Sequence, residues 1–251
     1  MSVRISVVTA VYNSRDTVAQ AVASVLSQTH REVETILIDG ASTDGTLAIL
    51  QPYRDRLDVF VSERDNGIYD ALNKGIEHAT GDIVGFLHAD DLFAHRAVLA
   101  RVAEAFSDPH VEAVYGDLVY VRHDNVDHVV RYWRAGEFEP GALRRGWMPP
   151  HPTFYVRRCV YQRLGLFDTR YRIAADYDSV LRFLGPGGVR AAYIPQVMVR
   201  MRVGGISNRS IGNILRKSRE DLDAIRGNGV GGISTLLQKN LSKLSQFWRR
   251  Q

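Results

Sequence analysis

The sequence has few of the features that mark secreted, membrane-spanning or zinc-thiolate proteins. It contains one cysteine, Cys159, which excludes an internal disulfide framework and argues against a cysteine-based zinc site. No run approaches the ~20 apolar residues that a membrane-spanning helix needs, and the apolar run at the N-terminus is too short for a signal peptide. These absences predict a cytoplasmic protein that is soluble or bound peripherally to the inner face of the cell membrane.

Phosphate-binding glycine motifs and sequence repeats are also absent. Neither GxGxxG nor GxxxxGK[ST] occurs, which argues against a Rossmann dinucleotide fingerprint and a P-loop. The 251 residues, 45% hydrophobic and 24% charged, suffice for one sizeable α/β domain or two small ones. The net charge of +4 and the pI near 9.3 favour an anionic partner such as a phosphate, a nucleic acid or an acidic lipid.

Strand and helix patterns alternate over the first ninety residues. We expect strands at residues 3–9, 33–38, 59–61 and 83–87, with helices after residue 14, before Pro52 and over residues 68–79. Such alternation predicts a mostly parallel, layered sheet. Polar residues follow three of the strands, at 9–13, 39–44 and 88–91, and so converge at the sheet edge where α/β folds bind ligands.

The pattern changes after about residue 110. Short strands are expected at 111–115, 118–121 and 128–133, followed by a loop-rich region over 134–150, a helix over 176–184 and a strand near 190–194. A further change begins at residue 227, where a basic amphipathic tail runs to residue 251. Such a helix can lie on an anionic membrane surface or pack its apolar face on its own domain, and the sequence leaves both open.

Residues 88–91, His-Ala-Asp-Asp, end an apolar strand and form the strongest local motif. The adjacent carboxylates Asp90 and Asp91 can bind a hard divalent cation such as Mn²⁺ or Mg²⁺ through oxygen, with a diphosphate supplying further ligands. Alternatively, the two carboxylates cap a helix that begins near Ala94.

Two earlier turns carry candidate ligands for a nucleotide. Asp39 follows the second strand and could accept hydrogen bonds from a base edge or from ribose hydroxyls, or belong to an ordinary turn. Asn73 and Lys74 follow an Asn-Gly turn and could reach a phosphate or a ribose, although Lys74 could equally be a solvated surface residue.

The second half of the chain supplies four further candidates. Asp176 opens a helix and could accept the proton of an attacking hydroxyl, or simply cap that helix. His151 is held between two prolines and could line a site or serve packing. Arg202 and Arg209 bracket a glycine-rich loop that could fold over a diphosphate, or form a surface turn with solvated arginines.

Together these segments resemble the inverting family 2 glycosyltransferases of the GT-A fold. Residues 6–13, 38–46 and 66–76 (NGIYDALNKGI) look like the nucleotide-binding half of that family. The last segment is similar to bacterial enzymes that build surface polysaccharides of the colanic acid and O-antigen type. The resemblance covers residues 3–210 and implies an α/β fold with a Rossmann-like, mostly parallel central sheet flanked by helices and a mixed acceptor-side half.

The resemblance implies roles for the matched positions. A nucleotide-sugar-binding half would span residues 1–110 and an acceptor-binding and catalytic half residues 111–226, ahead of the tail at 227–251. Ala10, Tyr12 and Asp39 would hold the nucleoside, Asp90 and Asp91 would stand at the DxD site that binds Mn²⁺ or Mg²⁺ on the donor diphosphate, and Asp176 would be the catalytic base. The family also implies an acceptor hydroxyl on a lipid-linked glycan, in surface polysaccharide or glycolipid biosynthesis.

Three positions depart from the family pattern. His88 replaces the usual first Asp of DxD, Gly40 replaces the second Asp after the second strand, and Ala175 replaces the Glu before the base. Asp90 and Asp176 remain, so we expect catalytic activity.

Three other classes stay open. A sugar nucleotidyltransferase usually has a Gly-rich, Arg-containing loop after its first strand, and residues 9–14 lack one. A non-catalytic nucleotide-sugar-binding subunit would fit the altered residues 88–91 and 175. A nucleic-acid-binding protein would need a basic stripe with interleaved aromatic residues, whereas the basic residues here are scattered, so no nucleic acid partner is expected.

Overall fold

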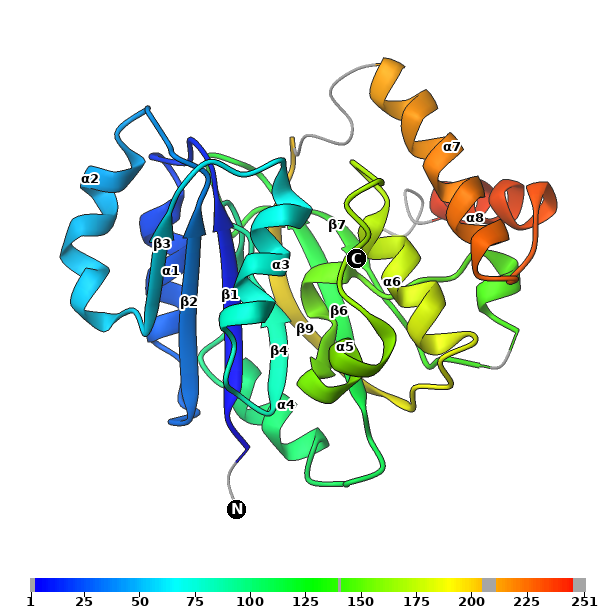
Figure 1. Cartoon of the computed structure of the whole chain (residues 1–251), viewed down its shortest axis with the longest axis horizontal. Coiled ribbons are helices and arrows are strands. Elements are labelled where there is room, and N and C mark those ends of the chain that lie inside the picture. The colour runs from blue at the N-terminus through cyan, green and yellow to red at the C-terminus, as the bar shows by residue number, and fades with distance from the viewer. Residues whose placement is uncertain (1–2, 140, 205–210, 246–251) are drawn as a thin grey trace.

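The computed structural model describes residues 3–139, 141–204 and 211–245, which form one sheet of nine strands with helices on both faces (Figure 1). The strands are β1 (Ile5–Val11), β2 (Val33–Asp39), β3 (Val59–Ser62), β4 (Ile83–Phe86), β5 (Leu92–Phe93), β6 (Ala113–Val121), β7 (Val129–Trp133), β8 (Tyr155–Arg157) and β9 (Ala191–Arg202). The helices are α1 (Val18–Leu26), α2 (Thr46–Leu50), α3 (Ile68–His78), α4 (Val98–Ala105), α5 (Arg158–Leu164), α6 (Ala175–Leu184), α7 (Ile211–Gly227) and α8 (Ile233–Ser245), with short 3-10 turns at Gln51–Arg56, Leu143–Arg145 and His151–Thr153.

Parallel pairing dominates the N-terminal side of the sheet. The strand order is β3-β2-β1-β4-β8-β6-β9-β5, with β7 beside β6, and the first four strands in this order are mutually parallel. β1 is buried along its whole length, because helices cover both faces of the sheet and a strand so placed is apolar on both sides. The expected mostly parallel, layered sheet is therefore confirmed.

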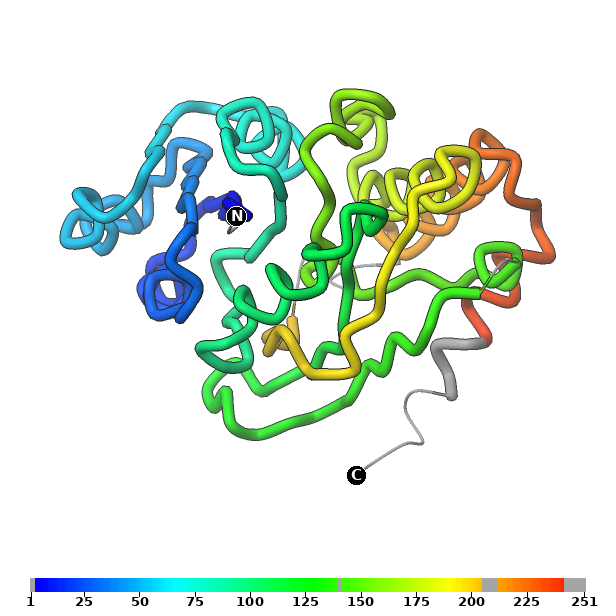
Figure 2. The backbone as a smooth tube through the Cα atoms, turned by 90° about the horizontal axis from the view of Figure 1, so that it is seen from below, coloured from blue at the N-terminus to red at the C-terminus, as the bar shows by residue number. Residues whose placement is uncertain are grey.

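The helices form two layers. α3, α5 and α6 pack with the strands on one face, and α1 and α4 cover the other, which is clearest along the sheet in Figure 2. Close approach of α3 to β1 depends on Gly75, because a Cβ there would lie 2.2 Å from a methyl group of Val8. This contact places the N-terminal turn of α3 near the carboxyl ends of β1 and β4.

Several elements of the second half differ from the expectation. The two short strands expected at 111–115 and 118–121 are one strand, β6, whose register against parallel β9 shifts around Gly116 and Asp117. A Cβ on Gly116 would lie 2.4 Å from the sulfur of Met198, so the polar Gly-Asp pair marks a close strand contact and not a break. β5, β8, α5 and α7 were not expected at all.

The C-terminal helix α8 has one face packed on the protein and one apolar face that is exposed. Its Lys239 is buried and lies 2.8 Å from a carboxylate oxygen of Asp221 on α7, so one face packs on the protein itself. Ile233, Leu237 and Leu241 are 58%, 58% and 64% exposed, and their spacing of four residues makes them one apolar stripe. No helix among the described residues combines the length and apolar character needed to cross a membrane.

Candidate functional site

The loops after β1 and β2 are joined side by side at the carboxyl edge of the sheet. The backbone N–H of Asn13 donates to Ser42 Oγ at 2.8 Å, and the N–H of Thr43 donates to Asn13 Oδ1 at 2.9 Å. Asn13 and Ala41 have φ angles of 47° and 60°, which residues other than Gly rarely adopt. The two loops therefore form one braced platform beside the exposed ring of Tyr12, while Ala10 lies largely buried within β1.

Asp39 braces this platform from inside. Its carboxylate is fully buried and accepts the backbone N–H of Ser42 at 3.1 Å and the hydroxyl of Ser62 at 2.7 Å. These bonds stabilise the turn that follows β2. The structure thus gives Asp39 a supporting role in the turn, and its contact with a base or ribose stays a prediction.

Asp65 is a candidate that the sequence argument did not single out. A Cβ on Gly40 would lie 2.4 Å from Asp65 Oδ2 and 3.3 Å from the ring of Tyr12, so the carboxylate and the ring approach each other over the bare backbone of Gly40. Asp65 is half-buried, and its other oxygen accepts the N–H of Gly67 at 2.9 Å. The sequence signal for Asp65 was Gly40, which stands where the family usually has a second Asp. The missing side chain at position 40 leaves room for the carboxylate of Asp65.

Asn73 and Lys74 on α3 are both engaged by the protein. The Asn73 amide donates to the carbonyl of Phe167 and accepts its N–H, each at 2.9 Å. Lys74 Nζ lies 2.6 Å from a carboxylate oxygen of Glu63 and 3.1 Å from the carbonyl of Arg64. Both side chains hold neighbouring loops, and their contact with the donor stays a prediction.

Asp90 and Asp91, in the loop after β4, differ in burial. Asp90 is half-buried, whereas Asp91 is fully buried and accepts the backbone N–H of Arg202 at 3.2 Å through Oδ1. Burial, and next the charge of Asp90, raise the pKa of Asp91 well above its usual range. Of the two carboxylates, Asp90 is the one available to a ligand.

Arg202 fastens the same loop and does not face an open diphosphate site. Its side chain is 3% exposed, and its guanidinium donates to the Asp90 carbonyl at 2.5 Å, to the His123 carbonyl at 3.3 Å and to the Gln20 amide oxygen. In this structure Arg202 has a structural role, and its contact with a diphosphate stays a prediction. Arg209 lies outside the described residues.

His88 and His151 form the centre of the site. Their rings lie 5.9 Å apart, and His151 stacks on Phe86 at 5.4 Å. Among the described residues, neither ring nitrogen of His151 nor Nδ1 of His88 has a hydrogen-bond partner. Buried polar atoms are nearly always satisfied in folded proteins, so these nitrogens indicate a place where a ligand or water binds.

The charges of two carboxylates, Asp90 and Asp176, act on the pair of histidine rings. Burial lowers the pKa of His88, and the charges of Asp90 and Asp176 act in the opposite direction. Burial lowers the pKa of His151 to about 4, again opposed by Asp176. At neutral pH both rings are uncharged, and the charge of Asp176 acts on both of them, whereas that of Asp90 acts on His88.

Asp176 is positioned by a tyrosine from α3. The carboxylate lies in the first turn of α6, and its Oδ1 is 3.1 Å from the Tyr69 hydroxyl, which is itself 2.8 Å from the carbonyl of Ile173. Glu220 on α7 accepts the N–H groups of Ile173 and Ala174 at 2.8 and 3.0 Å, and also that of Arg172 at 3.2 Å. Glu220 thus fixes the segment that leads into Asp176, and no sequence motif pointed to it.

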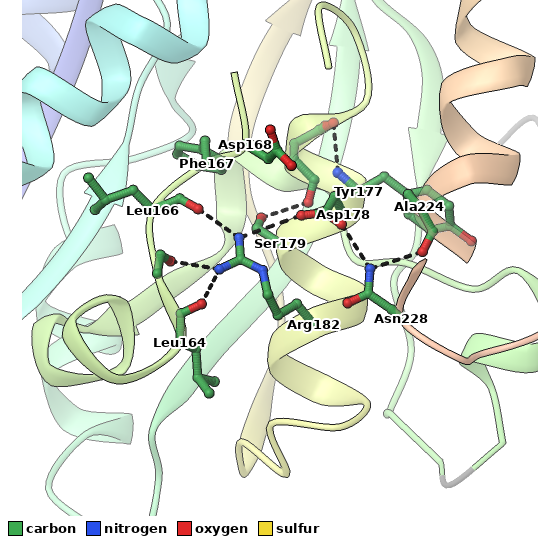
Figure 3. Close-up of polar contacts among 12 residues, drawn as sticks. Leu164, Leu166, Phe167, Asp168, Tyr177, Asp178, Ser179, Arg182, Ala224 and Asn228 are labelled. Carbon is green, nitrogen blue, oxygen red and sulfur yellow. Dashed lines mark hydrogen bonds and ion pairs between the residues drawn. The ribbon is translucent and has the colours of Figure 1, made fainter. Parts of the chain in front are cut away.

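A second network holds the loop before that segment (Figure 3). The Arg182 guanidinium donates to the carbonyls of Leu164, Gly165 and Leu166 and lies 3.5 Å from Asp178, which accepts a bond of 2.8 Å from Asn228. Arg182 thereby caps α5 and sets the path of the chain to Phe167, whose ring packs edge-on to His151. Several hydrogen bonds and an ion pair therefore hold the wall of the site on this side.

The residues of the site could hold a divalent cation only together with ligand oxygens from the donor diphosphate. Within the described part of the chain, no three His, Cys, Asp or Glu side chains are arranged to hold a metal ion. Mg²⁺ and similar ions are commonly held by one or two carboxylates together with substrate phosphates and water. Asp90, half-buried beside unpartnered imidazole nitrogens, fits that description.

The chain resembles proteins of known class over most of its length. Residues 6–170 match the family model described as "Glycosyl transferase family 2". A PGL/p-HBAD biosynthesis glycosyltransferase of Mycobacterium bovis is 33% identical over 191 residues, which cover 74% of this chain and 72% of that protein. The putative glycosyltransferase EpsE of Bacillus subtilis is 32% identical over 195 residues, which cover 73% of this chain and 68% of EpsE.

Solved structures agree in fold. The mannosyltransferase PcManGT from Pyrobaculum calidifontis, in complex with GDP-Man and Mn²⁺, has a TM-score of 0.68 at 21% identity, covering 99% of this chain and 72% of PcManGT. S. aureus TarS has a TM-score of 0.65 at 18% identity, and the matched region covers 98% of this chain and 43% of TarS. The architecture is the GT-A fold, as expected, and the chain belongs to glycosyl transferase family 2.

Proposed function

We propose that the protein is an inverting glycosyltransferase that moves a sugar from a nucleoside-diphosphate donor to an acceptor hydroxyl. The main support is that Asp90, in the loop after parallel strand β4, and Asp176, held by Tyr69, both act electrostatically on His88, which neighbours His151. Relatives whose names include glycosyltransferase, and a structural neighbour solved with GDP-Man, support a nucleotide-sugar donor.

In this proposal the nucleoside lies on the platform after β1 and β2. The exposed ring of Tyr12 offers a stacking surface, and the Asp65 carboxylate beside it can accept hydrogen bonds from a base edge. The diphosphate then points toward Asp90. Asp39 supports this arrangement by holding the turn from below.

Asp176 is the proposed base. It accepts the proton of the acceptor hydroxyl while the acceptor oxygen bonds to the anomeric carbon from the side opposite the diphosphate. The bond from that carbon to the diphosphate oxygen breaks, and its electron pair stays with the leaving nucleoside diphosphate, so configuration inverts. A Mn²⁺ or Mg²⁺ ion at Asp90, when bound, would supply positive charge to the leaving group.

The site offers neutral rings where the reacting sugar would lie. His88 and His151 are uncharged at neutral pH and have unpartnered nitrogens, so each can donate to or accept from sugar hydroxyls. Both walls are fixed, by Arg202 behind Asp90 and by Asn73 and Arg182 behind Phe167. Fixed polar groups lose little free energy to reorganisation when charge develops.

The acceptor proposed is a lipid-linked glycan, with the protein resting on an anionic membrane surface. The exposed stripe of Ile233, Leu237 and Leu241 supports this, because an amphipathic helix binds such surfaces through its apolar face. A role in a biosynthetic pathway is consistent with the relative named as a PGL/p-HBAD biosynthesis glycosyltransferase.

A donor screen tests the class of reaction. Purified protein is incubated with UDP-, GDP- and dTDP-sugars and Mn²⁺, and released nucleoside diphosphate is measured with and without EDTA. Release from one donor that stops with EDTA is expected. Release that EDTA does not affect would exclude metal dependence, and nucleotide binding without any turnover over a broad acceptor panel would instead support a non-catalytic subunit.

A further inference from the structure

An arginine-lined cavity lies beside the segment that carries Asp176. Its volume is about 520 Å³, within the range of roughly 300–1,000 Å³ typical of ligand sites. Four arginines line it, together with Tyr171 and two carboxylates: Arg170, Arg172, Arg216, Arg219, Glu220 and Asp223. We call this cavity the arginine pocket.

The charges in the arginine pocket are unbalanced. Arg170 lies 2.6 Å from Asp168 and is neutralised there, and Glu220 is occupied by the three backbone N–H groups that it accepts. Within the described residues, the guanidinium groups of Arg172, Arg216 and Arg219 make no ion pair or hydrogen bond. Glu220 and Asp223 are the carboxylates that offset part of this charge, and three guanidinium groups against two carboxylates leave the lining positive.

The geometry of α7 concentrates this charge. Arg216, Arg219 and Asp223 are spaced at three and four residues, which places them on one face of the helix, facing the loop that carries Arg172. Arginine guanidinium groups bind phosphate oxygens through paired hydrogen bonds, and several together hold a multiply charged group. The lining therefore suits a phosphate or a diphosphate better than a neutral sugar.

The position of the arginine pocket relates it to the acceptor. Arg172 is four residues before Asp176, a chain distance of at most roughly 14 Å. Glu220 binds both the wall of the arginine pocket and the segment entering Asp176. The proposed nucleoside platform lies elsewhere, at the edge formed by β1, β2 and β3, and in Figure 1 α7 stands at the opposite end of the sheet from β3 and α2.

We propose that the arginine pocket binds a phosphate or diphosphate group carried by the acceptor, so that the acceptor hydroxyl meets Asp176. This rests on the proposed transferase function and specifies its acceptor as a phosphate-bearing molecule. The lipid-linked glycan proposed above would then be attached to its carrier through phosphate, and recognition would require that group.

The test measures binding of two probes without donor or metal. Inorganic pyrophosphate and farnesyl diphosphate are titrated into the full chain in EDTA, with farnesol as the uncharged comparison. The double variant Arg216→Gln/Arg219→Gln is expected to lose at least tenfold in affinity for both probes, while Arg226→Gln, an exposed arginine of α7 outside the cavity, keeps wild-type affinity. Circular dichroism confirms that both variants are folded.

Three results would overturn the proposal. Equal pyrophosphate affinity in the double variant and the wild type would remove the anion site. A parallel loss of nucleoside diphosphate affinity would assign the arginines to the donor. Loss of binding to phosphatidylglycerol vesicles, but not to phosphatidylcholine vesicles, with unchanged affinity for both probes would assign them to membrane headgroups.

Failure of the proposed function is visible separately. Donor turnover by the wild-type chain is measured in the screen described above and does not involve the probes. Turnover together with unchanged probe affinity in the double variant would remove the arginine pocket and leave the transferase proposal standing. Selective loss of probe affinity supports the arginine pocket whichever donor is used.

Discussion

Tyr69 connects the proposed base to its surroundings through one hydroxyl proton. The hydroxyl lies within hydrogen-bond distance of both the Ile173 carbonyl and Asp176, yet it can donate to one of them at a time. Burial, and next the charge of Asp176, raise the pKa of Tyr69 well above its usual range, so it remains a donor at neutral pH. When it donates to Ile173, the Asp176 carboxylate is free to take the acceptor proton.

Substitution of the base tests the assignment of Asp176. Asp176→Asn should lower the rate of sugar transfer by roughly 10²–10⁴-fold, because the amide cannot accept the hydroxyl proton. Nucleoside diphosphate affinity should stay within about twofold, since the side chain keeps its size and lies away from the platform. Rate and affinity are measured on the same preparation by product release and calorimetry.

The neighbouring carboxylate provides the contrast. Asp178 is buried, with Arg182 and Asn228 as partners, so Asp178→Asn should lower the melting temperature and leave the transfer rate of folded protein near the wild type. Equal loss of transfer in both variants, or equal loss of transfer and donor affinity in Asp176→Asn, would contradict the role of Asp176 as base.

Glu34 predicts a pH dependence of stability. Burial alone would raise its pKa, but hydrogen bonds from Ser6 and Thr80 and the charge of Arg4 hold the pKa below its usual value. The stabilisation is therefore present above the unfolded pKa of about 4.3 and is lost as pH falls through the folded value.

The measurement compares Glu34→Gln with the wild type in urea at pH 7, 5 and 3.5. Glu34→Gln should cost about 2 kcal/mol of unfolding free energy at pH 7, because hydrogen bonds to a charged group are removed. The difference should shrink toward pH 3.5, because the carboxylate of the unfolded chain takes up its proton first as pH falls below about 4.3. A difference that grows as pH falls would contradict the stated direction of the pKa shift.

At the scale of elements, α8 depends on one buried charge. Lys239 lies 2.8 Å from Asp221 and 3.0 Å from the ring centre of Tyr177, and its backbone passes so close to Gly146 that a Cβ there would lie 2.5 Å from Lys239 Cα. Removing one member of a buried pair costs about 3–5 kcal/mol, because the other charge is left behind. Lys217, 3.1 Å from Asp221, reduces that cost here.

Lys239→Ala should therefore release α8 before the rest of the protein unfolds. Hydrogen exchange at α8 is expected to accelerate by at least tenfold while exchange in β1 and β2 stays unchanged. Lys243→Ala on the same helix removes an equal charge from the tail and serves as the control. Uniform acceleration across all elements would mean that α8 is part of the main cooperative unit.

The elements that the sequence predicted well are those with long patterns. β1, α1 and α3 carry enough apolar residues in register to define their type, and the observed bounds differ from the expected ones by a few residues. β5 and β8 have two and three residues, too few to show a period, and they exist because β9 and β6 pair with them. Their hydrogen-bond partners lie far away in the sequence.

The site was predictable where a local motif or the family resemblance marked it. Asp90 and Asp176 follow a strand and open a helix, and the charges of both act on His88, while that of Asp176 also acts on His151. The contacts of Asn73 and Lys74 could not be predicted, because their partners, Phe167 and Glu63, come from loops whose paths no local pattern describes.

Glu220 shows the same limit. It stands 46 residues beyond the Ala174 N–H that it accepts, on a helix with no motif, so its role became visible only once α7 was placed. Asp65 could have been sought once Gly40 was seen to lack the family carboxylate, because a carboxylate missing from one loop can be supplied by the next loop along the chain.

At the scale of the whole molecule, the exposed stripe on α8 predicts a surface property. The triple variant Ile233→Gln/Leu237→Gln/Leu241→Gln should reduce binding to phosphatidylglycerol vesicles by roughly tenfold or more, because it removes apolar burial at the interface. Vesicle sedimentation measures the binding. Substitution is preferable to deleting residues 232–251, since deletion also removes the buried Lys239.

Ile214→Gln/Leu215→Gln on α7 is the matched control, because those side chains are 52% and 68% exposed but lie on another helix. The control should bind vesicles like the wild type. Equal vesicle binding by the triple variant and the wild type would remove the proposed membrane contact of α8, without bearing on catalysis.

The contacts of Arg202 affect whether halves of two related proteins can be joined into one functional chain. A side chain at the end of β9 reaches the Asp90 carbonyl and Gln20 on α1, so the last strand of the sheet supports the loop proposed to bind the donor diphosphate. The two halves named from the sequence are therefore not interchangeable modules. A chimera that joins residues 1–110 to the second half of a relative would need an arginine at the equivalent of position 202, and without it should bind nucleotide sugars more weakly than either parent.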